Sequence, residues 1–170
     1  LVARKLIALK MPELAAHMEP HNSYFIGTDV FYQYMVLNRC AELKARHKLE
    51  KEHFQEAEEL TRRLQNGKIP EEIRVQLEEM LDHYGNLPII VRSSSIMEDG
   101  YGNAFSGKYE SVFCMNQGTK EERLKELEDA IRRVYASVMN ESAIEYRRKR
   151  HLLDMDEQMA LLIQQVSGQT

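Results

Sequence analysis

The strongest constraint on the fold of this chain is a short apolar run, Ile89-Ile90-Val91, that leads directly into an arginine and three serines. Such a run, bounded by small polar residues, predicts a buried β-strand that ends at Arg92. A glycine-rich segment follows as far as Gly107, and residues 109–115 then resume a strand-like pattern. We therefore predict a hairpin with a long connection, in which the arginine stands at the tip of the first strand.

The chemistry of this connection favours an anionic ligand. Glycines let backbone N–H groups approach an anion closely, and serine hydroxyls add hydrogen-bond donors. The guanidinium of Arg92 is a planar fork that matches two phosphate oxygens at once. The segment is neither a Walker-type loop nor a dinucleotide fingerprint, because the Gly-Lys-Ser/Thr and the third glycine of those motifs are absent. The alternative is an ordinary hairpin in which Arg92 pairs with Glu98 or Asp99 at the surface.

Several blocks of the sequence resemble one known family. Residues 89–95, the acidic pair Glu98-Asp99 and residues 104–111 are similar to the N-terminal nucleotide-binding domain of the phosphoenolpyruvate synthase and pyruvate phosphate dikinase family. The resemblance continues, in order, through residues 130–137, 143–147 and 161–166.

This resemblance implies an α+β fold, a partial ATP-grasp-like nucleotide-binding domain with helices packed on a mixed or antiparallel sheet. It also implies a phosphotransferase, inactive as an isolated fragment, that passes a phosphoryl group from ATP through a phosphohistidine to pyruvate. The expected partners are ATP and the phosphohistidine and pyruvate-binding domains of the parent chain. Members of the family commonly have a glutamine near the position of Lys108 and a leucine-proline pair near that of Gly100-Tyr101. This chain departs from the family pattern at both places. Related enzymes phosphorylate an antibiotic or a glucan, so the acceptor stays open.

The same resemblance assigns roles to individual residues. Arg92 is the expected catalytic residue and the chief phosphate contact. The rest of the phosphate cradle is expected to comprise Ser93, Ser94, Ser106, Gly107 and Lys108. The adenine is expected to lie against Gln164, Gln165 and Val166. The family's Gly-Gly-Lys block is not found near Lys5 or Lys10, and its magnesium ligands are expected beyond Thr170, so no metal ligand is assigned within the chain.

Composition and charge favour a cytoplasmic protein that binds neither nucleic acid nor membranes. The net charge of −4 gives no general attraction to polyanions. The cations at 147–150 suit a helix C-terminus, and they are too few for a nucleic-acid surface. Cys40 and Cys114 offer neither a disulfide framework nor metal-ligand spacing, which is typical of reduced cytosolic thiols. No apolar run reaches the length of a membrane span.

Helical periodicity occupies much of the remaining sequence. Helices are predicted over Asp29–Asn38, with Thr28 as N-cap, over Arg39–Gln65 and over Glu71–Tyr84. A capping box formed by Thr119 and Glu122 predicts a helix that reaches about Asn140. A further helix is expected from about Ala143 to Leu153, and a strand over 159–166.

We expect residues 1–170 to form a single unit that is part of a longer protein. Within it, residues 28–84 are mainly helical, 87–115 form the phosphate-loop hairpin, 119–153 are helical and 158–166 form a strand. The alternative from another functional class is a non-catalytic interaction module built on the charged helix over 39–65, whose Glu and Lys/Arg residues alternate.

Overall fold

The computed structural model describes residues 23–43, 54–95, 107–152 and 158–166, together with Lys10 and Glu98. Its strands are β1 (Ser23–Ile26), β2 (Ile89–Ser95), β3 (Ser111–Cys114) and β4 (Met159–Gln165). Its helices are α3 (Thr28–Leu37), α5 (Phe54–Asn66), α6 (Glu71–Tyr84), α8 (Lys120–Ala136) and α9 (Glu141–Lys149), with a 3-10 turn η1 (Ser137–Met139). The predicted α+β fold class is therefore confirmed.

The four strands form one sheet in the order β1-β4-β2-β3, and every neighbouring pair is antiparallel. The predicted hairpin is present, because β2 pairs with β3 from Ile89↔Cys114 to Arg92↔Ser111. β4, the last described strand in the chain, lies between β1 and β2. Two segments far apart in sequence are thereby held on either side of the final strand.

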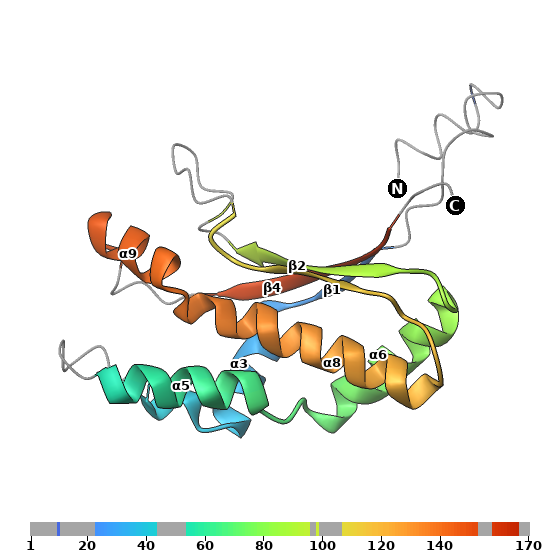
Figure 1. Cartoon of the computed structure of the whole chain (residues 1–170), viewed down its shortest axis with the longest axis horizontal. Helices are drawn as coiled ribbons and strands as arrows, with labels where there is room; N and C mark the ends of the chain where they lie inside the picture. Colours follow the sequence, from blue (N-terminus) through green and yellow to red (C-terminus); the bar gives the residue numbers. More distant parts are fainter. Residues whose placement is uncertain are drawn as a thin grey trace.

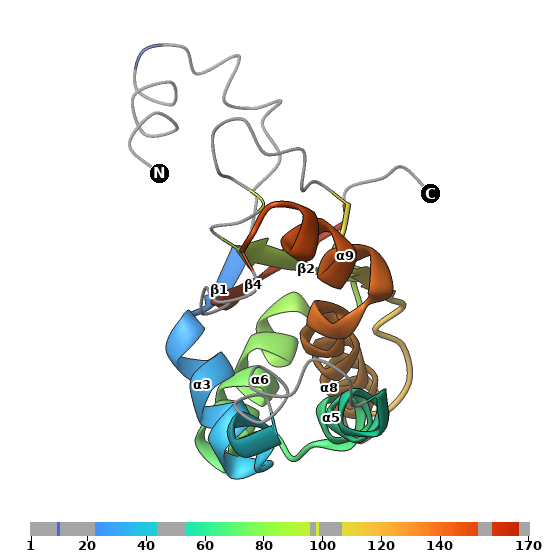
Figure 2. The same cartoon turned by 90° about the vertical axis from the view of Figure 1, so that its left-hand side faces the viewer.

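The helices α3, α5, α6 and α8 all lie on one side of this sheet (Figures 1 and 2). Alternate residues of the two central strands face them, and Ile89, Val91, Leu161 and Ile163 are fully buried. Burial of such side chains contributes about 1.5–3 kcal/mol each, so this interface is the main source of stability. The opposite side of the sheet, which we call the outer face, carries the intervening residues.

Helix α8 is the centre of the helical layer. It packs against α5, α6, β2 and β3 through a buried stripe formed by Leu124, Leu127, Ala130, Ile131 and Val134. The predicted capping box is confirmed at its start. The Thr119 hydroxyl accepts from the Glu122 backbone N–H, and the Glu122 carboxylate accepts from Thr119 N at 2.8 Å. The hydrogen bonds that Thr119 donates to the Glu122 carboxylate also lower the pKa of that carboxyl.

Several predicted boundaries need correction. Helix α3 begins at Thr28 itself, and the residue in the N-cap position is Gly27, without a side-chain cap. Arg39 adopts a left-handed φ of 54°, so helical structure resumes only at Cys40. The middle of the predicted long helix, residues 44–53, lies outside the described residues. Helix α9 ends at Lys149 rather than near Leu153, because the chain turns at Arg150 and His151.

The most consequential correction concerns β2. The strand does not end at Arg92 but continues to Ser95, since Ser93, Ser94 and Ser95 pair with Leu161, Ala160 and Met159 of β4. Serine has only a modest preference for strands, so the local sequence predicts a loop there. Pairing with an apolar partner strand overrides that preference. Arg92 thus lies in the middle of a strand rather than at its tip.

Among the helices that the structure describes, none combines the length and the apolar character needed to cross a membrane.

Candidate functional site

The outer face of the sheet places Arg92 at the centre of a row of residues that crosses all four strands. Arg92 is paired with Leu162 of β4 on one side and with Ser111 of β3 on the other. Leu162 is paired in turn with Phe25 of β1. Directly opposed residues on neighbouring strands share a face, so these four side chains lie in line. Phe25 is 77% exposed, which shows that the described elements leave this face open.

Arg92 itself is exposed, and no described residue holds its guanidinium in a hydrogen bond or an ion pair. The pairing with Glu98 that an ordinary hairpin would offer is not formed. Glu98 instead accepts hydrogen bonds from the Ser93 hydroxyl at 3.0 Å and from the Ser95 backbone N–H at 3.3 Å. Asp99 lies outside the described residues. An exposed guanidinium beside an apolar strand residue is well placed to take an anionic ligand from solvent.

The serines after Arg92 divide between the two faces of the sheet. Successive side chains alternate along a strand, so Ser94 shares the outer face with Arg92, whereas Ser93 and Ser95 point toward the helical side. Ser95 is 3% exposed, in agreement with this alternation. The structure therefore brings Arg92 and Ser94 together and directs the Ser93 hydroxyl to Glu98 instead.

The far end of the hairpin contributes Gly107 and Lys108, while Ser106 lies outside the described residues. Gly107 has a φ of 78°, a left-handed conformation that favours glycine, and it is exposed. Lys108 is half-buried and lies within electrostatic reach of α9. Lys149 is the main cause of the lowered pKa of Glu145, and the charge of Lys108 adds to it.

The predicted base-binding residues lie at the end of β4, next to the strand that carries Arg92, with Val166 directly after the last strand residue. Gln164 is on the outer face, where its Nε2 donates to the Ser23 hydroxyl at 3.3 Å. Gln165 pairs with Ile89 and faces the helices. The Val166 backbone N–H donates to the Pro88 carbonyl at 2.8 Å. Val166 is thus beside Pro88, and four residues at ~3.4 Å each separate Pro88 from Arg92 by about 14 Å along the strand.

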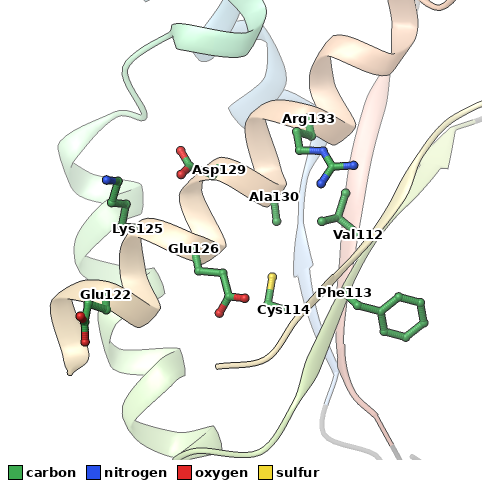
Figure 3. A pocket seen from close by; sticks show the side chains of 9 residues that line it. All are labelled: Val112, Phe113, Cys114, Glu122, Lys125, Glu126, Asp129, Ala130 and Arg133. Carbon is green, nitrogen blue, oxygen red and sulfur yellow. The ribbon is translucent and has the colours of Figure 1, made fainter. Parts of the chain in front are cut away.

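A separate open cleft of about 390 Å³ lies between β3 and α8 (Figure 3). Val112 and Cys114 of β3 line it from one side, and Lys125, Asp129 and Arg133 are among the lining residues of α8. It contains none of the predicted nucleotide-binding residues. The cleft belongs to the helical side of the sheet, because Val112 and Cys114 are the inward-facing residues of their strand.

Glu126 also lines the cleft. Its carboxylate accepts hydrogen bonds at 2.9 Å from the backbone N–H groups of both Met115 and Asn116. Arg133 is paired with Glu110 at 3.3 Å. These contacts tie the end of β3 and the loop before it to α8, so the charged groups around the cleft serve the packing of the hairpin.

No set of three His, Cys, Asp or Glu side chains suited to hold a metal ion occurs within the described ranges. The outer face offers a cation, hydroxyls and an amide, but none of its described residues is a carboxylate. Magnesium prefers carboxylate and phosphate oxygens. The described part of this face therefore does not fit a magnesium site.

Sequence reasoning missed two features around Arg92. Leu162 lies directly beside Arg92 and Phe25 lies beyond Leu162, but an isolated apolar residue in a strand gives no local sign of which cation it will face. Glu98 was considered as an ion-pair partner of Arg92, although its spacing from Ser93 and Ser95 lets one carboxylate bridge both. A search for acidic side chains that can reach back to a serine-rich strand end would have found it.

Comparison with known proteins shows the family of this chain. The family described as the pyruvate phosphate dikinase AMP/ATP-binding domain matches residues 5–170. No match was found among the curated proteins. The antiparallel sheet with helices on one face is compatible with a partial ATP-grasp-like nucleotide-binding domain. Because the match spans nearly the whole sequence, this chain belongs to the pyruvate phosphate dikinase AMP/ATP-binding domain family.

Proposed function

We propose that this chain is the ATP-binding portion of a phosphotransferase that passes a phosphoryl group from ATP, by way of a phosphohistidine, to pyruvate. Membership of the family makes the chain an ATP-binding part of a dikinase. The phosphohistidine route and pyruvate as acceptor are proposed in addition to this family membership. In this proposal, residues 1–170 act as one unit, and the phosphohistidine and the pyruvate site belong to other domains of a cytoplasmic parent protein.

The observation that carries the proposal is the exposed Arg92 in the middle of an open sheet face. Phosphoryl transfer depends chiefly on positioning and on stabilising charge on the phosphoryl oxygens. A guanidinium that no described residue engages can form two parallel hydrogen bonds to a phosphate. A rigid central strand also holds its backbone in place, which a loop would not do.

The remaining cradle residues are proposed to act around this cation. Ser94 shares its face and can donate its hydroxyl to a neighbouring oxygen. Gly107 would supply close-approaching backbone, and Ser106, outside the described residues, is proposed to add a hydroxyl donor. Lys108 would add positive charge near the loop, and Ser93 would shape the cradle through its backbone, since its hydroxyl is bonded to Glu98.

The nucleotide base is proposed to lie at the end of β4, against Gln164, Gln165 and Val166, with Gln165 contributing its backbone because its side chain faces the helices. The distance of about 14 Å along the strand from Arg92 to the level of Val166 is comparable to the length of an extended nucleoside triphosphate. A nucleotide laid along the boundary of β2 and β4 would therefore contact both predicted subsites. Its triphosphate would lie over Leu162 and Arg92, and its base over the strand end.

Magnesium is expected to accompany the nucleotide, with ligands other than the described residues of the outer face. Because the described outer face lacks carboxylates, we assign no residue here to the metal and derive no step through it.

The test is kinetic and uses the full-length parent protein. Arg92→Ala is expected to lower ATP-dependent turnover by orders of magnitude without loss of fold, and Arg92→Lys to retain part of it. The matched control is Arg133→Ala, which removes another exposed arginine on the helical side of the sheet and should leave turnover within about twofold. Unchanged steady-state kinetics in Arg92→Ala would remove this residue from the mechanism. Identification of the phosphorylated product with pyruvate, an antibiotic or a glucan as acceptor decides the final substrate.

A further inference from the structure

Beyond Arg92, strand β2 continues its pairing with β4 only. The pairing with β3 stops at Arg92↔Ser111, whereas the pairing with β4 continues to Ser95↔Met159. The segment from Ser93 to Ser95 is therefore paired with β4 but not with β3. Serine contributes little intrinsic strand preference, and β3 adds no strand pairing along these three residues.

Glu98 contacts this segment at two points. One carboxylate oxygen, Oε1, accepts from the Ser93 hydroxyl at 3.0 Å, and the other, Oε2, accepts from the Ser95 backbone N–H at 3.3 Å. A single half-buried side chain thus joins the inward-facing Ser93 hydroxyl to the backbone N–H of Ser95. Hydrogen bonds to a carboxylate are stronger than those between neutral groups.

The bonds to Glu98 also affect the outer face, because side-chain directions alternate along the strand. Ser93 lies between Arg92 and Ser94, so a fixed inward direction for Ser93 fixes an outward direction for both neighbours. A slip or twist of one residue at this point would exchange the two faces. The two bonds to Glu98 oppose that change where β3 no longer does.

We infer that Glu98 is a positioning residue, whose carboxylate holds the Ser93–Ser95 segment extended so that Arg92 and Ser94 face the nucleotide together. This role deepens the proposed function and rests on it. Glu98 does not contact the ligand. It acts through the backbone of β2, and its removal weakens the alignment of the phosphate contacts while the buried core stays intact.

The experiment uses the full-length parent protein and two independent readouts. The first is amide hydrogen exchange at Ser95, which reports the bond to Glu98 without any nucleotide. The second is the separation of KM for ATP from kcat. Glu98→Ala removes both bonds, whereas Glu98→Gln keeps the shape of the side chain but retains only one acceptor oxygen. Glu110→Ala is the control, because Glu110 is an acidic residue of the same hairpin and its 3.3 Å ion pair with exposed Arg133 does not involve the Ser93–Ser95 segment.

In Glu98→Ala we expect exchange at Ser95 to accelerate about tenfold, the change that loss of one charge-assisted hydrogen bond produces. We expect KM for ATP to rise by about the same factor, with an intermediate value in Glu98→Gln and no change in Glu110→Ala. Ser93→Ala should raise KM less than Glu98→Ala, and adding it to Glu98→Ala should have no further effect.

The outcomes separate this inference from the proposed function. If Arg92→Ala loses activity while Glu98→Ala keeps native exchange at Ser95 and native KM, only the positioning role fails. If Glu98→Ala accelerates exchange at Ser95 but leaves KM unchanged, the positioning role also fails, since the bonds then have no effect on the nucleotide. If Arg92→Ala is fully active, the proposed function fails and the positioning role fails with it.

Discussion

The hydroxyl of Tyr34 in α3 donates a 2.6 Å hydrogen bond to the backbone carbonyl of Leu64 near the end of α5. This carbonyl belongs to the last turn of a helix, where carbonyl groups lack intrahelical partners. The neighbouring ring of Tyr135, in α8, lies 5.2 Å from that of Tyr34, and both rings are buried. The Tyr135 hydroxyl is buried too, but it has no hydrogen-bond partner among the described residues.

These two tyrosines give a matched pair of variants. Tyr34→Phe removes a donor from a buried carbonyl and should lower the free energy of unfolding by about 1–2 kcal/mol. Tyr135→Phe removes a hydroxyl that has no partner to lose, so it should change the free energy of unfolding by less than about 0.5 kcal/mol or raise it. Urea unfolding measures both, and an equal loss in the two variants would contradict the assignment.

Gly67 lies against the same tyrosine. A Cβ added there would stand 2.6 Å from Tyr34 Cζ and 2.8 Å from Asn38 Cγ, both closer than real contacts allow. Asn38 cannot move freely, because its amide donates to the Tyr34 carbonyl at 2.9 Å and to the Lys68 carbonyl at 3.0 Å. Gly67→Ala should therefore lower the free energy of unfolding by about 1–3 kcal/mol through overpacking. Gln65→Ala, at an exposed position of α5, is the control, and a neutral effect of Gly67→Ala would refute the close packing.

The pH dependence of stability should show the contribution of Glu59. Hydrogen bonds from Arg62 and Arg63 lower the pKa of this carboxyl from 4.5 to about 2. A lowered folded-state pKa stabilises the fold above the unfolded value, and this stabilisation disappears as the pH falls from about 4.5 toward 2. Glu59→Gln should therefore unfold at a lower midpoint urea concentration than the native chain at pH 7. The gap between the two midpoints should narrow at pH 3. Glu58→Gln, at an exposed position of the same helix, is the control for the loss of a surface carboxylate. A gap that stays constant with pH would exclude this linkage.

Both cysteines should resist modification in the native state. Burial raises the pKa of the Cys40 thiol to about 11 and that of Cys114 to about 12. Only the thiolate reacts, so each thiol is protected by low ionisation as well as by lack of access. With a disulfide reagent at pH 8 we expect slow reaction in buffer and rapid reaction of both thiols in denaturant. A fast stoichiometric reaction of the folded chain would show that one site is open.

Local signals predicted the features that depend on nearby residues. The capping box of Thr119 and Glu122 and the bounds of α6 followed from spacing alone, because caps and helical stripes are set within one or two turns. The end of β2 could not be predicted in this way. Ser93 to Ser95 are extended because Met159 to Leu161 lie beside them, and no pattern around the serines announces that partner.

The same reasoning applies to the candidate site. Residue chemistry and the family resemblance both pointed to Arg92 as a candidate, but its surroundings depend on two distant strands. Leu162 lies beside the arginine, and Phe25 beyond Leu162, only after β1, β4 and β2 have assembled in that order. Nor does the sequence indicate that Ser93 and Ser94 face opposite sides, because that follows from the continuation of the strand.

The place of β4 in the sheet has a further consequence for the synthesis of the chain. Ser23 and Gln164, which share a side-chain hydrogen bond, are 141 positions apart. Strands β1 and β2 emerge from the ribosome long before β4, the strand that pairs with both of them. Until β4 is made, the edges of β1 and β2 that it will pair with have no strand partner there. Contacts of such high sequence separation slow folding, and a chain released before residue 159 would lack the strand that unites the two halves of its sheet.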